Sequence, residues 1–167
     1  GREDFLKSMD SDGSLFGVGN GIIKLGKKIE FIDHYHEHKV SRFTPVRYKP
    51  FNPNNQATKD MLDYFKSIIP ELDARFRIVM GFAACLDGWP KDPELSIFSA
   101  GGSNGKTTLM LMICKVFGSM YGNNASADIL TSDPPSPDKP NSGVAMFERK
   151  RFLYMEESTN GGALNAK

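Results

Sequence analysis

The stretch Gly101-Gly102-Ser103-Asn104-Gly105-Lys106-Thr107-Thr108 has the residue types of a loop that binds phosphate. Glycines let the backbone curl so that successive N–H groups point at anionic oxygens, and the N-terminus of a following helix adds partial positive charge. Lys106 is placed to reach the β- and γ-phosphates of a nucleoside triphosphate, and the Thr107 hydroxyl to ligate its Mg²⁺. We therefore expect these eight residues to bind a triphosphate such as ATP together with Mg²⁺.

The residues on either side of this loop have the patterns of a strand and a helix. Leu95–Ser99 predicts a short buried strand, and Thr107–Phe117 predicts a helix that ends at Gly118. The strict loop pattern has a glycine where this chain has Ala100, a mild departure that the two glycines after it can offset. Strand, loop and helix thus follow in the order that a phosphate-binding loop requires.

A second apolar run, Arg151–Met155, ends in Glu156 and Glu157. A central strand of a parallel sheet is apolar throughout, and ligands gather at the carboxyl ends of such strands. We assign Glu156 to the Mg²⁺ shell and Glu157 to the water that attacks the γ-phosphate, so that both act with Lys106 in catalysis. A shift of one residue in the end of the strand would exchange the two glutamates, so the division of roles stays open.

Three segments follow one another along the chain. Residues 1–56 form a small β-rich segment and a linker, with apolar runs at 22–25, 29–32 and 44–48 between turn residues. Residues 57–90 predict two or three helices, and residues 91–167 the first half of a P-loop ATPase core, with a long polar loop over Asn123–Ser142. The helical stripes are formed by Met61, Leu62, Phe65, Ile68 and Ile69, then by Phe76, Ile78, Val79, Phe82, Ala83 and Leu86. The fold class is therefore α/β, an incomplete P-loop NTPase core preceded by a β-rich and a helical segment.

Composition sets broader limits. With 167 residues, 40% of them hydrophobic, the chain can bury one good core, and a net charge of +1 leaves any contact with nucleic acid to local patches. Cys85 and Cys114 stand alone on apolar helical stretches, which favours free thiols in a reducing compartment. No apolar stretch approaches the ~18 residues of a membrane span, and the N-terminus lacks a signal-peptide pattern. We expect a soluble intracellular protein without a membrane partner.

Three further features have structural and functional interpretations. His34, His36 and His38 share one face of an extended segment and could hold a transition metal, although such alternation is more often a solvated strand face. Trp89 is interpreted as a packing anchor. The basic run Arg149-Lys150-Arg151 predicts a charged helix end before the strand, with contact to DNA or to a neighbouring subunit as the alternative.

Taken together, the motifs resemble those of the superfamily 3 helicases, of the primase-helicase type found in poxviruses, other nucleocytoplasmic large DNA viruses, phages and plasmids. The similar segments are Gly102–Leu109 and Arg151–Glu157, with a hairpin at Asn20–Leu25 and a strand at Thr44–Tyr48 upstream. The helical stretch Phe65–Leu86 also resembles the segment that precedes the ATPase in this family. The resemblance covers nearly the whole chain.

This resemblance implies an AAA+ ATPase that forms a ring, usually a hexamer, and moves along single-stranded DNA to unwind a replication fork, at a cytoplasmic viral replication site or in the nucleus. Ala100–Thr108 corresponds to motif A, Glu156 and Glu157 to motif B, and Leu164–Lys167 to the start of a motif that faces DNA. By resemblance, a sensor asparagine and an arginine finger are expected beyond Lys167, and a primase part before Gly1. Since an arginine finger contributes roughly 10³ to 10⁵ in turnover, such a fragment is expected to bind ATP and hydrolyse it slowly.

Two other classes of protein also use a phosphate-binding loop of this kind. A P-loop nucleoside or small-molecule kinase would transfer phosphate to an acceptor, but it leaves the acidic pair and the upstream hairpin unexplained. A module for assembly or DNA loading would use ATP as a structural switch without hydrolysis. Stimulation of phosphate release by single-stranded DNA separates the helicase from both.

Overall fold

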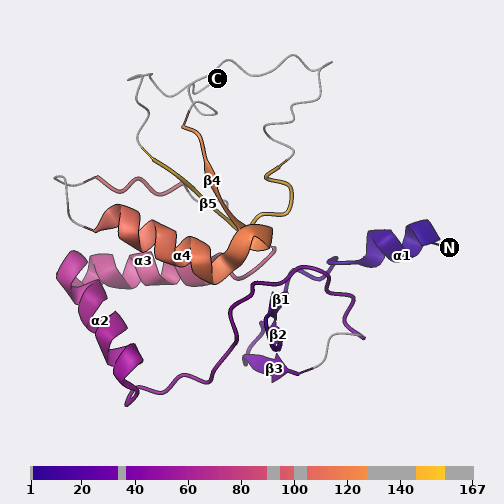
Figure 1. The fold of residues 1–167 in the computed structure, drawn as a ribbon, viewed down its shortest axis with the longest axis horizontal. Helices are drawn as coiled ribbons and strands as arrows, with labels where there is room; N and C mark the ends of the chain where they lie inside the picture. The colour runs from indigo at the N-terminus through magenta and orange to yellow at the C-terminus, as the bar shows by residue number, and fades with distance from the viewer. Residues whose placement is uncertain (1, 34–36, 90–94, 100–104, 128–145, 157–167) are drawn as a thin grey trace.

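Two small β-sheets and four helices make up the part of the chain that the computed structural model describes, residues 2–33, 37–89, 95–99, 105–127 and 146–156 (Figure 1). The first sheet is antiparallel, with β1 (Leu15–Val18), β2 (Gly21–Lys24) and β3 (Glu30–Ile32) in that order. The second sheet is a parallel pair of β4 (Gly122–Ala125) and β5 (Phe152–Met155). The mixed α/β class expected from the sequence is confirmed at this level.

The N-terminal sheet confirms the expected β-rich segment, but one of its strands is absent. Residues 44–48 form no strand, because Pro45 lacks the N–H that a regular ladder needs. The segment instead covers the outer edge of β1 through two backbone hydrogen bonds, from Thr44 N to Gly17 O (3.0 Å) and from Gly19 N to Val46 O (2.8 Å). The prediction of a strand at Thr44–Tyr48 was therefore wrong, although the segment does lie beside the sheet.

Two helices follow, as the periodicity predicted: α2 (Gln56–Ile68) and α3 (Leu72–Ala84). Asn55 caps α2 by accepting a hydrogen bond from Ala57 N (2.9 Å), and Pro70 separates the two helices. The apolar stripes are buried only in part. Half-buried members pack against the core, whereas others are exposed; the first group is Phe65, Ile68, Ile69, Phe82 and Leu86, and the second Met61, Leu62, Phe76 and Val79.

Helix α4 (Lys106–Tyr121) changes direction at Gly118, where the sequence predicted its end. Gly118 has φ 65° and ψ 170°, which only glycine adopts readily, and the helical turns resume as far as Tyr121. The chain then enters β4 inside the region predicted as a loop from Asn123 to Ser142. That prediction was wrong for Asn123–Ala125, because pairing with β5 outweighs the low β-propensity of asparagine. The loop residues from 128 onward lie outside the described ranges.

The predicted strand at Leu95–Ser99 is not present. These residues have no regular structure, and Leu95 and Ile97 are 71% and 76% exposed. An apolar run becomes a strand only when a neighbour takes up its backbone hydrogen bonds. Among the described residues β5 pairs with β4, and no strand pairs with residues 95–99.

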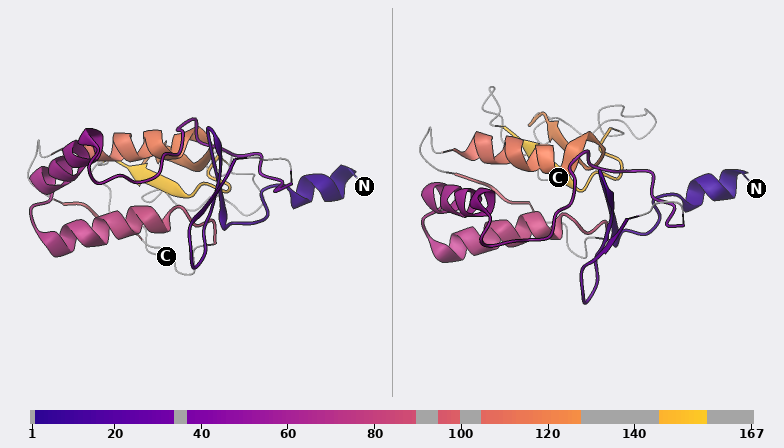
Figure 2. Two further views of the ribbon diagram at one scale, coloured as in Figure 1. Left: turned by 90° about the horizontal axis from the view of Figure 1, so that it is seen from below. Right: turned by 60° about the horizontal axis from the view of Figure 1, so that its bottom comes forward.

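A row of aromatic rings connects the elements through one hydrophobic cluster. Phe16 of β1 stacks on Tyr121 (centroids 4.4 Å apart), and its ring meets the edge of Phe117 (5.8 Å). Phe117 stacks on Phe152 of β5 (5.4 Å), which in turn meets Phe82 of α3 (5.8 Å). Seen from below, β5 lies between α4 and α3 (Figure 2, left). The core thus draws on all three predicted segments, whose boundaries at 56 and 90 stay predictions.

Helix α1 (Arg2–Ser8) extends away from the other helices at the N-terminal end (Figures 1 and 2). Within the ranges that the structure describes, no helix combines the length and the apolar character needed to cross a bilayer.

Gly118→Ala is expected to lower the free energy of unfolding by about 1–3 kcal/mol, because alanine is strained at this φ and ψ. A Cβ at this position would also lie 2.9 Å from Cδ of Pro45 and 3.2 Å from Oγ1 of Thr44. Gly81→Ala in α3 is the matched control: a Cβ there meets nothing within 4 Å, so it should stabilise by roughly 0.5–1 kcal/mol. Urea unfolding of both variants measures this, and equal effects would contradict the assigned role of Gly118.

Candidate functional site

The N-terminus of α4 presents the end of the predicted phosphate-binding loop. Gly105 is its N-cap with φ 81°, and its carbonyl accepts the first helical hydrogen bond, from Leu109 N (2.9 Å). The first-turn amides after Gly105 are not used in the helix ladder, so this end carries partial positive charge. Thr107 and Thr108 are exposed there. Residues 101–104 lie outside the described ranges, so binding of ATP by the loop remains a prediction.

Helix α2 supports this end of the loop. The Tyr64 hydroxyl donates to Gly105 O (3.3 Å), and a Cβ at position 105 would lie 2.8 Å from Cγ2 of Ile68. Glycine is therefore required at 105 both by the left-handed φ and by the closeness of α2. Sequence reasoning missed Tyr64; an aromatic residue with a polar tip beside Phe65 of the apolar stripe was the available signal.

Glu156 directly follows β5, as predicted, at the carboxyl edge of the parallel pair, and it is exposed. The strand begins beside the far end of α4, where Arg151 N donates to Tyr121 O (2.7 Å). Lys106 begins α4 and Tyr121 ends it, while β5 leads from the Arg151 contact to Met155, so Lys106 and Glu156 both stand at the ends of their elements remote from this contact. Glu157 falls outside the described ranges, and its role stays a prediction.

Cys114 and Tyr154 mark the contact between α4 and β5. Burial raises the pKa of the Cys114 thiol, and burial followed by the charges of Cys114 and Glu156 raises the pKa of Tyr154. Neither Cys85 nor Cys114 forms a disulfide, and both are half-buried, as expected of thiols on apolar helical stretches.

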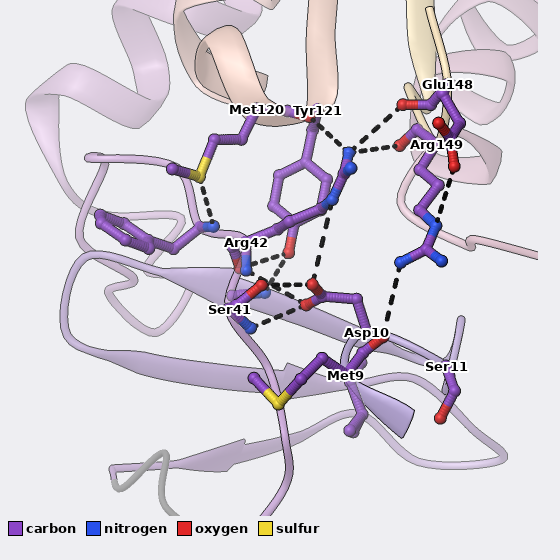
Figure 3. Close-up of polar contacts among 12 residues, drawn as sticks. Met9, Asp10, Ser11, Ser41, Arg42, Met120, Tyr121, Glu148 and Arg149 are labelled. Carbon is purple, nitrogen blue, oxygen red and sulfur yellow. Dashed lines mark hydrogen bonds and ion pairs between the residues drawn. The ribbon is translucent and has the colours of Figure 1, made fainter. Parts of the chain in front are cut away.

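The other end of α4 is joined to the N-terminal sheet through Tyr121 and Arg42 (Figure 3). The Tyr121 hydroxyl accepts a hydrogen bond from Gly17 N (3.0 Å) and donates one to Arg42 O (2.7 Å). Nη1 of Arg42 donates to three backbone carbonyls at 3.4–3.5 Å, those of Met120, Glu148 and Arg149. Sequence reasoning missed both residues, because their partners are far away along the chain.

Arg151 is part of the core and not of a charged helix end. It follows a turn in which Arg149 has φ 57°, and its side chain donates to Leu86 O and, at 2.7 Å, to Leu15 O. Its guanidinium carbon lies 4.8 Å from the Tyr121 ring centroid and 5.5 Å from that of Phe16. Burial lowers its pKa, but guanidinium stays charged in proteins. The prediction of a helix end was wrong because carbonyls of two other elements surround this residue.

Asp10 fastens the segment that carries Arg42. Its carboxylate accepts hydrogen bonds from Ser41 N (2.7 Å), Ser41 Oγ and Arg42 N (3.1 Å), and lies 4.0 Å from Arg42 Nε. Partial burial alone would raise the pKa of Asp10, but the hydrogen bonds from Ser41 and Arg42 hold it below the usual 3.8. The ionised form is thus the one that the fold stabilises.

The histidine and tryptophan predictions have different outcomes. His34 and His36 lie outside the described ranges, so a metal site there stays untested; elsewhere in the described chain no three acidic, histidine or cysteine side chains form a metal-binding group. Trp89 does pack, since a Cβ on Gly13 would lie 2.5 Å from its indole, yet 61% of its surface is exposed.

Comparison with known proteins relates the chain to segments of large viral proteins. It is 34% identical over 165 residues, 98% of its length, to the African swine fever virus protein named "Putative primase", in several isolates. It is 26% identical over 118 residues, 71% of its length, to the Acanthamoeba polyphaga mimivirus protein named "Putative helicase". The chain spans only 17% and 12% of the lengths of these relatives. No family model matches it. These similarities support a relation to viral primase-helicase proteins, while superfamily 3 in particular stays a prediction.

Asp10→Asn is expected to lower the free energy of unfolding at pH 7 by about 1–3 kcal/mol, because it weakens charged hydrogen bonds. A carboxyl with a lowered pKa stabilises the fold above its unfolded value of 3.8, and this contribution is lost as the pH falls through the lower folded value. The difference between the wild-type chain and the variant should therefore shrink below about pH 4. Urea unfolding at pH 7, 5 and 3 measures it.

Asp63→Asn is the control for this experiment. The Asp63 side chain is 72% exposed and pairs with Lys66 at 3.0 Å on α2, so its loss should cost under about 1 kcal/mol. A difference for Asp10→Asn that stays constant from pH 7 to pH 3 would contradict the role given to the ionised carboxylate.

Proposed function

We propose that this chain is the ATP-binding part of a viral DNA helicase, in which ATP hydrolysis drives movement along single-stranded DNA and unwinding of the duplex. The similarity over 165 residues to a viral protein named "Putative primase" carries the proposal, because that alignment includes the predicted phosphate-binding loop. The mimivirus relative named "Putative helicase" supports the same reading. In the proposal the chain acts in viral DNA replication inside the infected cell, which both names support.

The residues at the start of α4 suit a polyphosphate. Gly105 caps the helix without a side chain, in a left-handed conformation that glycine adopts readily, so no Cβ stands beside the first-turn amides. In the proposal these amides and the Lys106 ammonium hold the β- and γ-phosphates of ATP. Thr107 and Glu156 hold Mg²⁺, which neutralises charge on the phosphates when bound.

Glu157 is proposed to orient the attacking water and to accept its proton as the bond from the water oxygen to the γ-phosphorus forms and the bond from that phosphorus to the β,γ-bridging oxygen breaks, with ADP as the leaving group. Tyr64 contributes by fixing the Gly105 carbonyl, which positions the loop relative to α2. Assembly into a ring, an arginine finger from a neighbouring subunit and a primase part of the protein belong to the same proposal. They are supported by the family resemblance of the two motifs.

Lys106→Ala is expected to weaken ATP binding by at least about 10-fold, since it removes the cation assigned to the phosphates. Lys115→Ala, an exposed lysine on the same helix, is the matched control and should bind ATP normally. Titration with a fluorescent ATP analogue in Mg²⁺ measures both. Equal affinities of the two variants would reject the assignment of the loop.

Glu157→Gln is expected to retain ATP binding and to lose at least about 10²-fold in phosphate release stimulated by single-stranded DNA, because the amide cannot accept the proton of the water. Phosphate release is to be measured with the longest form of the protein that can be expressed. If Glu156→Gln alone has this phenotype, the two roles are exchanged. Phosphate transfer to a small acceptor without any response to DNA would favour a kinase, and nucleotide-dependent assembly without hydrolysis would favour a switch.

A further inference from the structure

A cavity of about 350 Å³ lies at the opposite end of α4 from the phosphate-binding loop, between the N-terminal residues and the turn before β5. Its volume falls in the range of small-ligand sites, ~300–1,000 Å³, so it holds about one nucleotide unit and no folded partner. Five basic side chains line it: Lys7, Arg42, Arg149, Lys150 and Arg151. Two acidic side chains, Asp10 and Asp12, do so as well, which leaves three positive charges in excess.

The hydrogen bonds of these basic groups do not cancel that charge. Arg42 and Arg151 donate mainly to backbone carbonyls, and so does Lys150, to Ser119 O. A carbonyl orients a cation without neutralising it. The carboxylate of Asp10 is held by Ser41 and Arg42, as Figure 3 shows. The cavity therefore keeps an excess of positive charge in its lining, which suits an anion.

Two of the cations are placed to meet a ligand from solvent. Lys7 is exposed at the end of α1, and the Arg149 side chain is 49% exposed. Arg149 contacts Glu148 at 3.6 Å, but Glu148 is itself 74% exposed and lies outside the cavity lining, so this pair is weak in water. Arg149 also donates to Met9 O at 3.5 Å, a long hydrogen bond to an uncharged acceptor, so both cations keep their positive charge for a phosphate.

An aromatic surface completes the site. Trp89 lines the cavity with 61% of its surface exposed. Its position is defined by Gly13 and Gly88: Gly88 N donates to Gly13 O (2.8 Å), Trp89 N donates to Oδ1 of Asp87 (2.9 Å), and the indole lies against Gly13. A fixed, exposed indole beside cations is the arrangement on which unpaired bases stack while their phosphates are held.

We propose that this cavity binds a single-stranded nucleic acid, with one base stacked on Trp89 and the adjoining phosphates on Lys7 and Arg149. A duplex keeps its bases inside and cannot offer one to the indole. The inference extends the proposed function, yet it uses no residue of the ATP site. Because nucleic-acid binding is measured without nucleotide, a negative result leaves the ATP-site assignment standing. A failure of the ATP-site assignment likewise leaves this inference standing.

The chain contains a single tryptophan, so its own fluorescence reports on the site. Addition of a dT oligonucleotide to the 167-residue chain without ATP is expected to quench Trp89 in a saturable way. The affinity should fall with salt with a slope of about −0.7 for each phosphate contact. Lys7→Ala combined with Arg149→Ala should weaken binding at least about 10-fold and reduce that slope by about 1.4.

Lys27→Ala combined with Lys28→Ala is the matched control, because it removes the same charge from the exposed turn between β2 and β3, away from this cavity. It should leave binding unchanged. Trp89→Ala should lower the affinity for a labelled oligonucleotide, read by anisotropy, about 10-fold, and Trp89→Phe should restore most of it, because a phenyl ring still stacks. Thermal unfolding of each variant shows whether its fold is intact.

Three results would overturn the inference. One is the absence of quenching, or equal loss of affinity in the cavity and control variants. A second is equal quenching by duplex DNA or by polyglutamate, which would indicate a general polyanion surface. The third is equal affinity for dTMP or inorganic phosphate, which would make this a site for free phosphates and not for a strand.

Discussion

Stacking of Phe16 on Tyr121, with the Arg151 guanidinium over both rings, is the interaction on which the arrangement of the chain depends. It joins β1, the end of α4 and the start of β5 at one point. From there Phe117, Phe152 and Phe82 continue the contact to α3. Aromatic pairs and a desolvated cation–π contact each contribute about 0.5–2 kcal/mol beyond area burial, so this row outweighs any single hydrogen bond of the structure.

A buried cation in such a place is stable only when its donors are satisfied. Carbonyls of Leu15 and Leu86 serve Arg151, and those of Met120, Glu148 and Arg149 serve Arg42. Each arginine thereby ties the N-terminal sheet or α3 to the end of α4 and the turn before β5. Because these carbonyl acceptors are uncharged, the hydrogen bonds of Arg42 and Arg151 leave their positive charge beside the cavity that both residues line. Arg42 and Arg151 thus serve the fold while adding positive charge to the cavity whose proposed phosphate contacts are Lys7 and Arg149.

Helix α4 connects the two regions that could act on ligands. Its first turn follows Gly105, the end of the proposed phosphate-binding loop, which Tyr64 and Ile68 of α2 contact, and its last turn borders the cavity with Trp89. Gly118 bends the helix between its first twelve residues and that last turn, where Thr44 and Pro45 come too close for any side chain. The proposed ATP site and the proposed site for single-stranded nucleic acid therefore lie at the two ends of α4 and share no residues.

Features set by local chemistry could be read from the residue order: the helix after Gly105, its break at Gly118, the two helices before it, strands β2 and β3 on either side of their turn, and the strand before Glu156. Each rests on a glycine conformation, a proline or an apolar period, all properties of neighbouring residues. Lys106, Thr107, Glu156 and Glu157 were candidate site residues for a similar reason, because these residue types occur at the spacing of a nucleotide-binding site. Strand β1 (Leu15–Val18) was not among the predicted strands. The local sequence pattern could not decide which segments would pair as β-strands. Asn123–Ala125 became a strand and Leu95–Ser99 did not, because a strand needs a partner that only the tertiary structure supplies. Likewise Tyr121, Arg42 and Arg151 became central through carbonyls and rings up to 136 residues away in sequence.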